Sequence, residues 1–195
     1  EAKGAGDEAI YITLSSALSG TYQTAAMPCE DADSEACYVF DSRNATGGQR
    51  IIVEYAAKLR DEGRSAAQII AALENVRDRI VLFACIDTLE YLKKGGRVSA
   101  ATALAGTVLS IKPAIEIKDG LVAMAGKARG SKMGNNLLVQ EIAKAGGVEF
   151  SKPLMLGYTG ISDALLRKYI QDSDALWKDY REELPVSTIG SVVGT

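Results

Sequence analysis

The stretch Ile10–Gln23, which reads IYITLSSALSGTYQ, decides the fold of this chain. Its first part, Ile10–Leu14, is β-branched, aromatic and aliphatic, a composition typical of a buried strand. The turn that follows carries three hydroxyls, on Ser15, Ser16 and Ser19. A predicted helix then begins at Thr21, and the first amides of a helix lack internal partners and carry partial positive charge. Strand, hydroxyl-rich turn and helix start together predict an anion site, where Gly20 would let a ligand approach the backbone.

Helix capping is the alternative role for the same hydroxyls. Ser16 or Ser19 could accept a hydrogen bond from a first-turn amide and do no more than start the helix. This stretch taken alone favours neither role. The choice between a cap and an anion site therefore depends on the rest of the chain.

Composition excludes several classes of function. The chain has 195 residues, a net charge of −3 and no histidine. The slight negative charge gives no electrostatic argument for nucleic acid, and no apolar run approaches the length of a membrane span. Without histidine, these residues hold no Ser-His or Cys-His catalytic unit and no histidine-ligated metal. The three cysteines lack C-x-x-C spacing, which predicts reduced thiols in a cytoplasmic protein: Cys29, Cys37 and Cys85.

Strands and helices alternate in the first part of the chain. A strand is predicted over residues 36–41, and helices over Gln49–Asp61 and Ala66–Arg77, with Ser65 starting the second helix. This order predicts an α/β fold with a wound parallel sheet. Asp41 and Ser42 end the strand, where they could face a ligand crevice or cap the next helix, and capping is slightly favoured.

The second part of the chain has a different pattern. A strand over Ile80–Ile86 is followed by a short helix that Asp87 is expected to cap, and by a largely apolar helix over Ala100–Leu109. Residues 111–125 then alternate around an Asp-Gly dipeptide, which predicts a β-hairpin. A basic loop is expected after the hairpin, at Lys127, Arg129 and Lys132, before further helices and strands. The change of pattern predicts two domains, residues 1–79 and residues 80–195, the second carrying the hairpin.

Four segments together resemble the DegV family. Residues 12–23, ITLSSALSGTYQ, match its Ser-Ser-x-Leu-Ser-Gly-Thr-Tyr segment, and residues 89–97, LEYLKKGGR, match its Leu-x-Tyr-Leu-x-x-Gly-Gly-Arg segment. Ile111-Lys112-Pro113 and Lys127-Ala128-Arg129-Gly130 match two more, in the family's order. The resemblance covers the whole chain, and the combination is much more specific than any of its segments.

The resemblance implies a two-domain protein that holds a long-chain fatty acid between its domains. Members of the FakB type present the fatty acid to a partner kinase, which converts the carboxylate to an acyl phosphate. By this resemblance the chain is a cytoplasmic carrier without catalytic residues, metal or cofactor, and it could contact the membrane peripherally during lipid exchange. The carboxylate site is expected at Ser19 and Gly20, with Ser16 and Thr21 in the same turn. Arg97 and Arg129 are expected at the mouth of the site or on the kinase-facing surface.

The chain departs from the family pattern at both ends. The family's first strand and two hydroxyl-bearing loops would precede Glu1, and its Gly-x-His-x-Gly-Pro-Gly segment would begin at Gly194. The resemblance therefore implies truncation at both ends, and residues 1–195 expressed alone are expected to carry little fatty acid. The competing hypothesis is an enzyme that acts on a phosphorylated or acylated small molecule through the serine-rich turn. The candidate serines are Ser15, Ser16 and Ser19, and since histidine is absent they would need a lysine to activate them, such as Lys93, Lys94 or Lys112.

Overall fold

The computed structural model describes residues 7–31, 36–98 and 111–190. The chain divides into two compact units, one formed by Glu1–Ile80 with Asp119–Leu121 and the other by Val81–Lys118 with Val122–Thr195. Mixed parallel and antiparallel pairing confirms the predicted α/β class. The predicted helix over Ala100–Leu109 lies outside the described residues. No helix in the described part of the chain combines the length and the apolar character that crossing a membrane would require.

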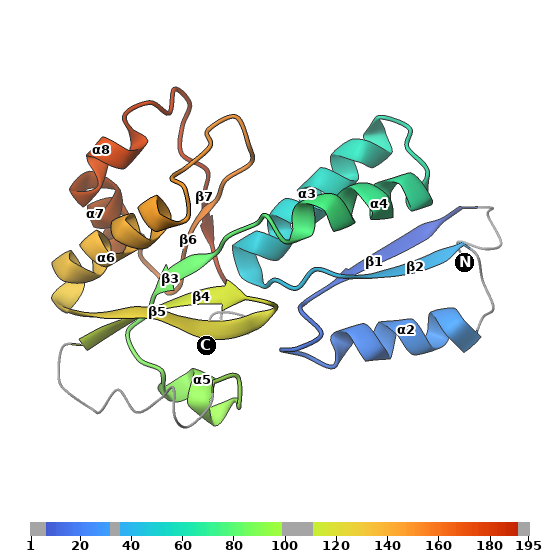
Figure 1. Cartoon of the computed structure of the whole chain (residues 1–195), viewed down its shortest axis with the longest axis horizontal. Coiled ribbons are helices and arrows are strands. Elements are labelled where there is room, and N and C mark those ends of the chain that lie inside the picture. The colour runs from blue at the N-terminus through green and yellow to red at the C-terminus, as the bar shows by residue number, and fades with distance from the viewer. Residues whose placement is uncertain (1–6, 32–35, 99–110, 191–195) are drawn as a thin grey trace. The chain divides into compact units, whose positions relative to one another are not determined.

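The first unit is built on two parallel strands. Its elements are β1 (Ala9–Thr13), α2 (Thr21–Asp31), β2 (Cys37–Asp41), α3 (Thr46–Asp61) and α4 (Ala66–Arg77). Strand β1 pairs in parallel with β2, with Ile12 opposite Phe40. Helix α2 lies on one face of this pair and α3 and α4 on the other, so the unit is wound on both faces (Figure 1).

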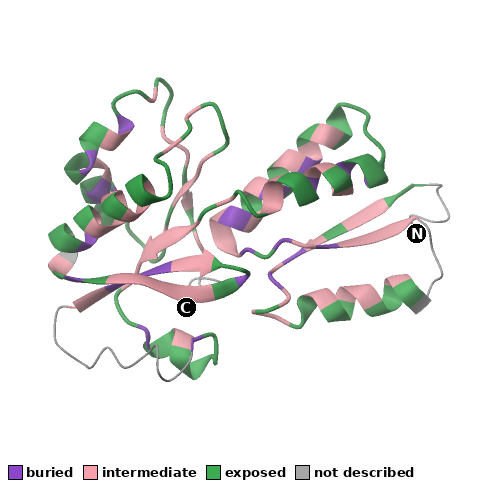
Figure 2. Cartoon of the chain, in the orientation of Figure 1, coloured by how far each residue is buried: buried purple, intermediate pink, exposed green. Residues whose placement is uncertain are grey.

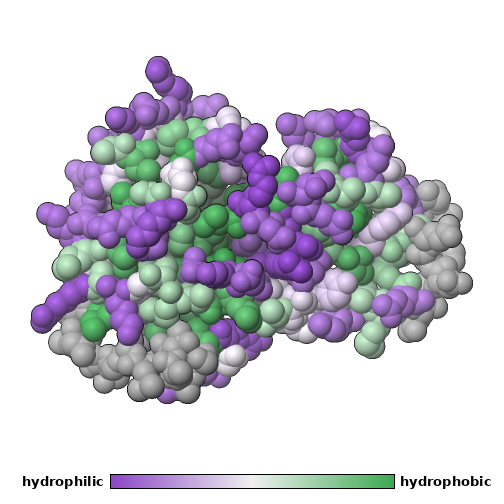
Figure 3. Space-filling model, viewed as in Figure 1, coloured by the Kyte–Doolittle hydropathy of each residue, from purple (hydrophilic) through white to green (hydrophobic). Residues whose placement is uncertain are grey.

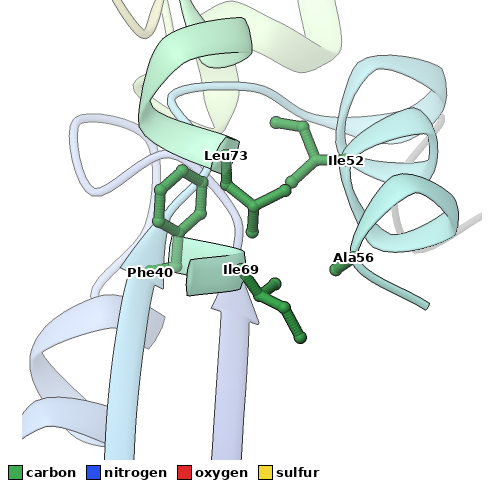
Figure 4. Close-up of a cluster of buried hydrophobic side chains, with 5 residues drawn as sticks. All are labelled: Phe40, Ile52, Ala56, Ile69 and Leu73. Atoms are coloured by element: carbon green, nitrogen blue, oxygen red, sulfur yellow. The ribbon is translucent and has the colours of Figure 1, made fainter. Parts of the chain in front are cut away.

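The core of the first unit lies between the sheet and the pair α3 and α4. Five buried side chains meet there: Phe40, Ile52, Ala56, Ile69 and Leu73. Phe40 comes from β2, Ile52 and Ala56 come from α3, and Ile69 and Leu73 come from α4 (Figure 4). Ser65 caps α4 through a capping box with Gln68, which confirms the predicted helix start. Burial of this hydrophobic cluster holds β1 and β2 against α3 and α4, and therefore positions the loops that follow the strands.

The second unit combines an antiparallel and a parallel sheet. Its elements are β3 (Phe83–Cys85), α5 (Glu90–Lys94), β4 (Ile111–Lys118), β5 (Leu121–Arg129), α6 (Gly130–Lys144), β6 (Leu156–Tyr158), α7 (Ala164–Asp172), α8 (Asp174–Trp177) and β7 (Val186–Thr188). One sheet has the order β3-β4-β5, and β6 pairs in parallel with β7. The core under α7 is built around Leu166, Tyr169 and Trp177. Hydrophilic residues cover much of the visible face, with hydrophobic ones between them (Figure 3).

The hairpin of the second half forms as the sequence predicts. Asp119 has φ 51° and Gly120 has φ 79°, the positive values that a two-residue type I′ turn requires at both positions. The basic loop expected after the hairpin is wrong, because β5 continues to Arg129 and includes Lys127. Lys132 lies in α6. Pairing with β4 supplies hydrogen bonds that local sequence does not reveal, so the strand extends through the charged residues.

The cysteines differ from the expectation of three reduced thiols. Cys29, in α2, and Cys37, the first residue of β2, form a disulfide with their Cα atoms 5.6 Å apart. Cys85 is free and half-buried. Burial raises the pKa of its thiol, and the negative charge of Asp87 adds to the rise, while the positive charge of Lys112 opposes it. Sequence spacing did not reveal the pair, since a helix and a parallel strand bring the two residues together.

Candidate functional site

The carboxyl ends of β1 and β2 place two polar loops side by side. Parallel pairing aligns Thr13 with Asp41, the last residues of the two strands. The amide of Ser15 donates a hydrogen bond of 2.9 Å to the carbonyl of Asn44. The amide of Ser42 donates one of 3.3 Å to the carbonyl of Thr13. The loops are therefore joined to each other at the edge of a parallel sheet where ligands commonly bind.

Buried hydroxyls hold these loops in place. Ser15 and Ser42 are fully buried and Asn44 is 3% exposed, so the loops leaving β1 and β2 contain buried polar positions (Figure 2). The hydroxyl of Ser42 donates to the carbonyl of Asn44 and accepts from its amide, both at 3.1 Å. The hydroxyl of Ser15 donates to the carbonyl of Gly120 at 2.6 Å. Because each buried hydroxyl is bonded, the loops avoid the cost of unpaired polar groups.

Asp41 binds the serine-rich turn instead of capping the next helix. Its Oδ1 accepts from the amide of Ser16 at 3.1 Å and its Oδ2 accepts from the hydroxyl of Ser16 at 2.5 Å. The amide of Arg43 donates to the same Oδ1 at 2.9 Å. Helix α3 begins at Thr46 after an N-cap, Ala45, without a side-chain cap. The favoured capping role of Asp41 and Ser42 is therefore wrong, and their alternative role, facing a ligand crevice, stays a prediction.

The hydroxyls of Ser19 and Thr21 lie together at the start of α2. Their oxygens are 2.6 Å apart, and the amide of Thr21 donates to the hydroxyl of Ser19 at 3.3 Å. Ser19 is half-buried, while Gly20 and Thr21 are exposed. A β-carbon built on Gly20 would meet no atom within 4 Å, so open space borders this backbone. Two hydroxyls and an accessible backbone meet at a helix start, an arrangement suited to an anion.

The turn brings together four of the predicted site residues, Ser16, Ser19, Gly20 and Thr21. The other two, Arg97 and Arg129, belong to the second unit. Arg97 follows α5, where it is exposed and donates through Nη1 to the carbonyl of Gly95. Arg129 is exposed at the last residue of β5, directly before α6.

Of the three lysines considered for an enzymatic serine, Lys94 and Lys112 are ion-paired in the second unit, and Lys93 is exposed in α5. Lys112 forms an ion pair with Asp87, and Lys94 forms one of 2.7 Å with Glu90. Asp87, which was expected to cap the helix after β3, therefore pairs with Lys112 instead. At the start of α5 it is the hydroxyl of Thr88 that accepts a hydrogen bond from the amide of Glu90. Among the described residues, no group of three His, Cys, Asp or Glu side chains is arranged to hold a metal ion.

Comparison with known proteins identifies the family of this chain. The model of the family described as "Uncharacterised protein, DegV family" matches residues 1–195. A DegV domain-containing protein of Clostridium perfringens is 32% identical over 199 residues, which cover 95% of this chain and 65% of that protein. The chain thus spans slightly less than two thirds of the length of this relative.

Two solved structures share the fold of this chain at more than 25% sequence identity. A DegV family protein from Eubacterium eligens, loaded with heptadecanoic acid, superposes with a TM-score of 0.81 at 26% identity, covering 100% of this chain and 71% of that one. A fatty-acid-binding DegV family protein from Thermus thermophilus gives a TM-score of 0.76 at 28% identity, covering 96% of this chain and 66% of that one. Family model, curated relative and solved structures agree, and the chain belongs to the DegV family.

Proposed function

We propose that this chain binds the carboxylate of a long-chain fatty acid at the turn formed by Ser19, Gly20 and Thr21. The observation that carries the proposal is the pair of hydroxyls at 2.6 Å at the start of α2. The family relatives from Eubacterium eligens and Thermus thermophilus, which bind fatty acids, support the class of ligand. Where the acyl chain lies in this protein stays a prediction.

Proton counting shows what the hydroxyl pair can offer a carboxylate. Ser19 and Thr21 have one hydroxyl proton each, and their mutual hydrogen bond uses one of them. The second proton is available to a ligand oxygen. Hydrogen bonds to an ionised carboxylate are about twice as strong as those between neutral groups, so a single well-placed hydroxyl contributes substantially.

The backbone of the turn adds to the attraction. The amide of Ser19 already donates to the carbonyl of Ser15 at 3.1 Å, so the proposed backbone contact is at Gly20. The exposed backbone there lets a carboxylate come close to the amino end of α2, where the helix dipole favours negative charge. The acyl chain would add about 0.8 kcal/mol for each buried methylene group. In this proposal the turn orients the carboxylate of the fatty acid, and burial of the acyl chain supplies most of the binding free energy.

Ser16 enters the proposal as part of the same turn. Both its amide and its hydroxyl donate to Asp41, so neither proton points to a ligand in this structure. Its remaining capacity is that of an acceptor, which an ionised carboxylate does not match. Ser16 thus belongs to the framework of the turn, and direct contact with the carboxylate is assigned to Ser19, Gly20 and Thr21.

Presentation of the carboxylate to a fatty-acid kinase is the second part of the proposal. It rests on the resemblance to FakB-type members and on the exposure of Arg97 and Arg129. An exposed arginine can form paired hydrogen bonds with a carboxylate or phosphate of a partner. The chain would then be a carrier, with the chemical step performed by the kinase. The enzyme alternative gains no support from Ser15 and Ser16, which donate to fixed acceptors, or from Lys94 and Lys112, which are ion-paired.

A cytoplasmic location is also part of the proposal. Cytoplasmic reductants keep most protein thiols reduced, so the redox state of Cys29 and Cys37 in cells provides a direct test. Thiol trapping in freshly lysed cells, followed by mass spectrometry, would measure it. Complete oxidation of the pair at lysis would contradict a reducing compartment.

Extraction of the purified chain tests the proposed ligand. The protein is purified without added lipid and extracted with organic solvent, and the extract is analysed by mass spectrometry. We expect only a small amount of a long-chain fatty acid, since residues 1–195 alone are expected to carry little of it, and delipidated protein should bind a fluorescent fatty acid in a titration. If neither extraction nor titration finds binding, this chain does not act as a fatty-acid carrier.

A further inference from the structure

Asp41 and Ser16 form the closest side-chain contact between the two polar loops of the first unit. They lie 25 positions apart in the sequence, yet both carboxylate oxygens of Asp41 accept hydrogen bonds from Ser16. The amide of Arg43 supplies a third donor to the same carboxylate. Charge-assisted bonds of this kind are short and strong, and the observed 2.5 Å between Ser16 Oγ and Asp41 Oδ2 agrees. Asp41 therefore ties the turn after β1 to the end of β2.

The restraint at Ser16 passes along the turn to Ser19. The carbonyl of Ser15 accepts from the amides of Leu18 and Ser19, at 3.0 and 3.1 Å. The hydroxyl of Ser15 also accepts from the amide of Ala17 at 3.3 Å. Residues from Ser15 to Ser19 thus form one compact turn, in which the position of Ser16 at its start fixes that of Ser19 at its end.

Asp41 is unsuited to direct contact with a fatty-acid carboxylate. An ionised carboxylate only accepts hydrogen bonds, and two like charges at close range repel each other. Its three observed partners are donors of its own loop and of the turn, so its contacts are all framework contacts. Any influence of Asp41 on the ligand must therefore act through the turn.

We propose that Asp41 is a positioning residue for carboxylate binding, acting through Ser16 to place the hydroxyl of Ser19. This inference rests on the proposed function. The hydrogen bonds of Asp41 select one arrangement of the turn before the ligand arrives, so that the ligand does not have to order it. Loss of this restraint would leave Ser19 present but free to adopt positions that do not match the carboxylate.

Two substitutions at Asp41 separate the restraint from the charge. Asp41→Ala removes all three acceptor contacts, and we expect it to weaken fatty-acid binding about tenfold. Asp41→Asn keeps an oxygen for the Ser16 amide and offers an amide proton to the Ser16 hydroxyl, so its affinity should stay within about threefold of the wild type. Asp61→Asn, in the same unit and exposed at the end of α3, is the control for the change of charge and should bind like the wild type.

A double-mutant cycle tests whether Asp41 acts through Ser19. Fatty-acid affinity is measured for Asp41→Ala, Ser19→Ala and the double variant. If Asp41 positions the Ser19 hydroxyl, the effect of Asp41→Ala should shrink to about twofold once that hydroxyl is gone. Effects that multiply fully would overturn the proposal, since they would mean that Asp41 acts by another route.

Amide exchange provides a readout that requires no ligand. In the complete chain without fatty acid, Asp41→Ala should speed hydrogen exchange at Ser16 and Ser19 at least tenfold while exchange in α4 stays unchanged. Unchanged protection at Ser19 would overturn the positioning role, and faster exchange in α4 as well would assign Asp41 to general stability instead. If the wild-type chain binds no fatty acid, the proposed function fails, and this measurement still decides whether Asp41 orders the turn.

Discussion

The side-chain oxygen Oδ1 of Asn44 lies 1.8 Å from the point where a β-carbon on Gly48 would stand. Asn44 is 3% exposed, and its backbone carbonyl accepts a hydrogen bond from the amide of Ser15, so Asn44 cannot move away easily. Glycine at position 48 therefore allows the first turn of α3 to pack directly against the loop that braces the serine-rich turn. This contact links the helix start to the candidate site.

Gly48→Ala tests the contact. The added methyl group must displace Asn44, and overpacking of this kind costs about 1 to 3 kcal/mol. We expect a lower melting temperature and weaker fatty-acid binding. Gly190→Ala is the control, because a β-carbon there meets open space. The double variant Asn44→Ala with Gly48→Ala should lose less stability than the two separate changes added together, and strict additivity would contradict the clash.

Ser19→Ala separates ligand binding from helix capping. We expect it to weaken fatty-acid binding by about 1 to 3 kcal/mol, the usual cost of losing a hydrogen bond to a charged group. Ser65→Ala is a matched control, since Ser65 caps α4 in the same unit through a capping box. Calorimetric titration and thermal melting should show that Ser65→Ala costs stability alone. Equal affinities for Ser19→Ala and Ser65→Ala would leave Ser19 as a cap.

Arg97→Glu and Arg129→Glu test the surface proposed to face the kinase. Both arginines are exposed, so reversing their charge should disturb a partner more than the fold. We expect acyl-phosphate formation with a fatty-acid kinase to fall at least tenfold while bound fatty acid, quantified by extraction, is retained. Arg181→Glu, at another exposed arginine of the second unit, serves as the control. Loss of the lipid itself would place these arginines in the carboxylate site.

The Cys29–Cys37 disulfide should stabilise the first unit. It closes a short loop, with a sequence separation of 8, and loop-closure entropy for such a loop corresponds to about 2 to 3 kcal/mol. A thiol reductant should therefore lower the melting temperature of the wild type and leave that of a Cys29→Ser, Cys37→Ser variant unchanged. Cys85→Ser should respond to the reductant as the wild type does. Equal melting with and without reductant would mean that the pair contributes nothing.

Tyr169 should weaken the second unit at high pH. Burial in the core with Trp177 raises the pKa of Tyr169 to about 12, and the side-chain hydrogen bond with Ser173 opposes this rise. Above its ordinary pKa of 10 the unfolded chain loses this proton while the folded chain retains it, so stability is complete below pH 10 and falls between pH 10 and 12. The loss should reach about 2 to 3 kcal/mol.

Denaturant titrations across this pH range measure the effect. Tyr169→Phe removes the titrating hydroxyl, so its stability should decline less between pH 10 and 12 than that of the wild type. Tyr91→Phe, at a tyrosine that is 58% exposed, should follow the wild-type profile. Identical profiles for all three proteins would show that Tyr169 is not held neutral by the fold.

Local chemistry determined much of this protein from the sequence. The Asp119-Gly120 pair predicts the hairpin because positive φ at two successive residues is easiest for these residue types. Ser65 predicts the start of α4 because a cap bonds amides only three residues away. The serine-rich turn after β1 marks the candidate site for the same reason, since its hydroxyls and the helix start are adjacent in the chain.

Tertiary structure decided the partners of those residues. From the sequence, capping is slightly favoured for Asp41, and only parallel pairing places it beside Ser16. Ser15 likewise bonds Gly120, which is 105 positions away. The sequence predicts a basic loop at Lys127 and Arg129, but both residues lie in β5, which pairs with β4. The sequence also predicts separate thiols, but the fold places Cys29 of α2 beside Cys37 of β2. Periodicity and propensity describe interactions within a few residues, whereas these contacts depend on how β-strands pair across the chain.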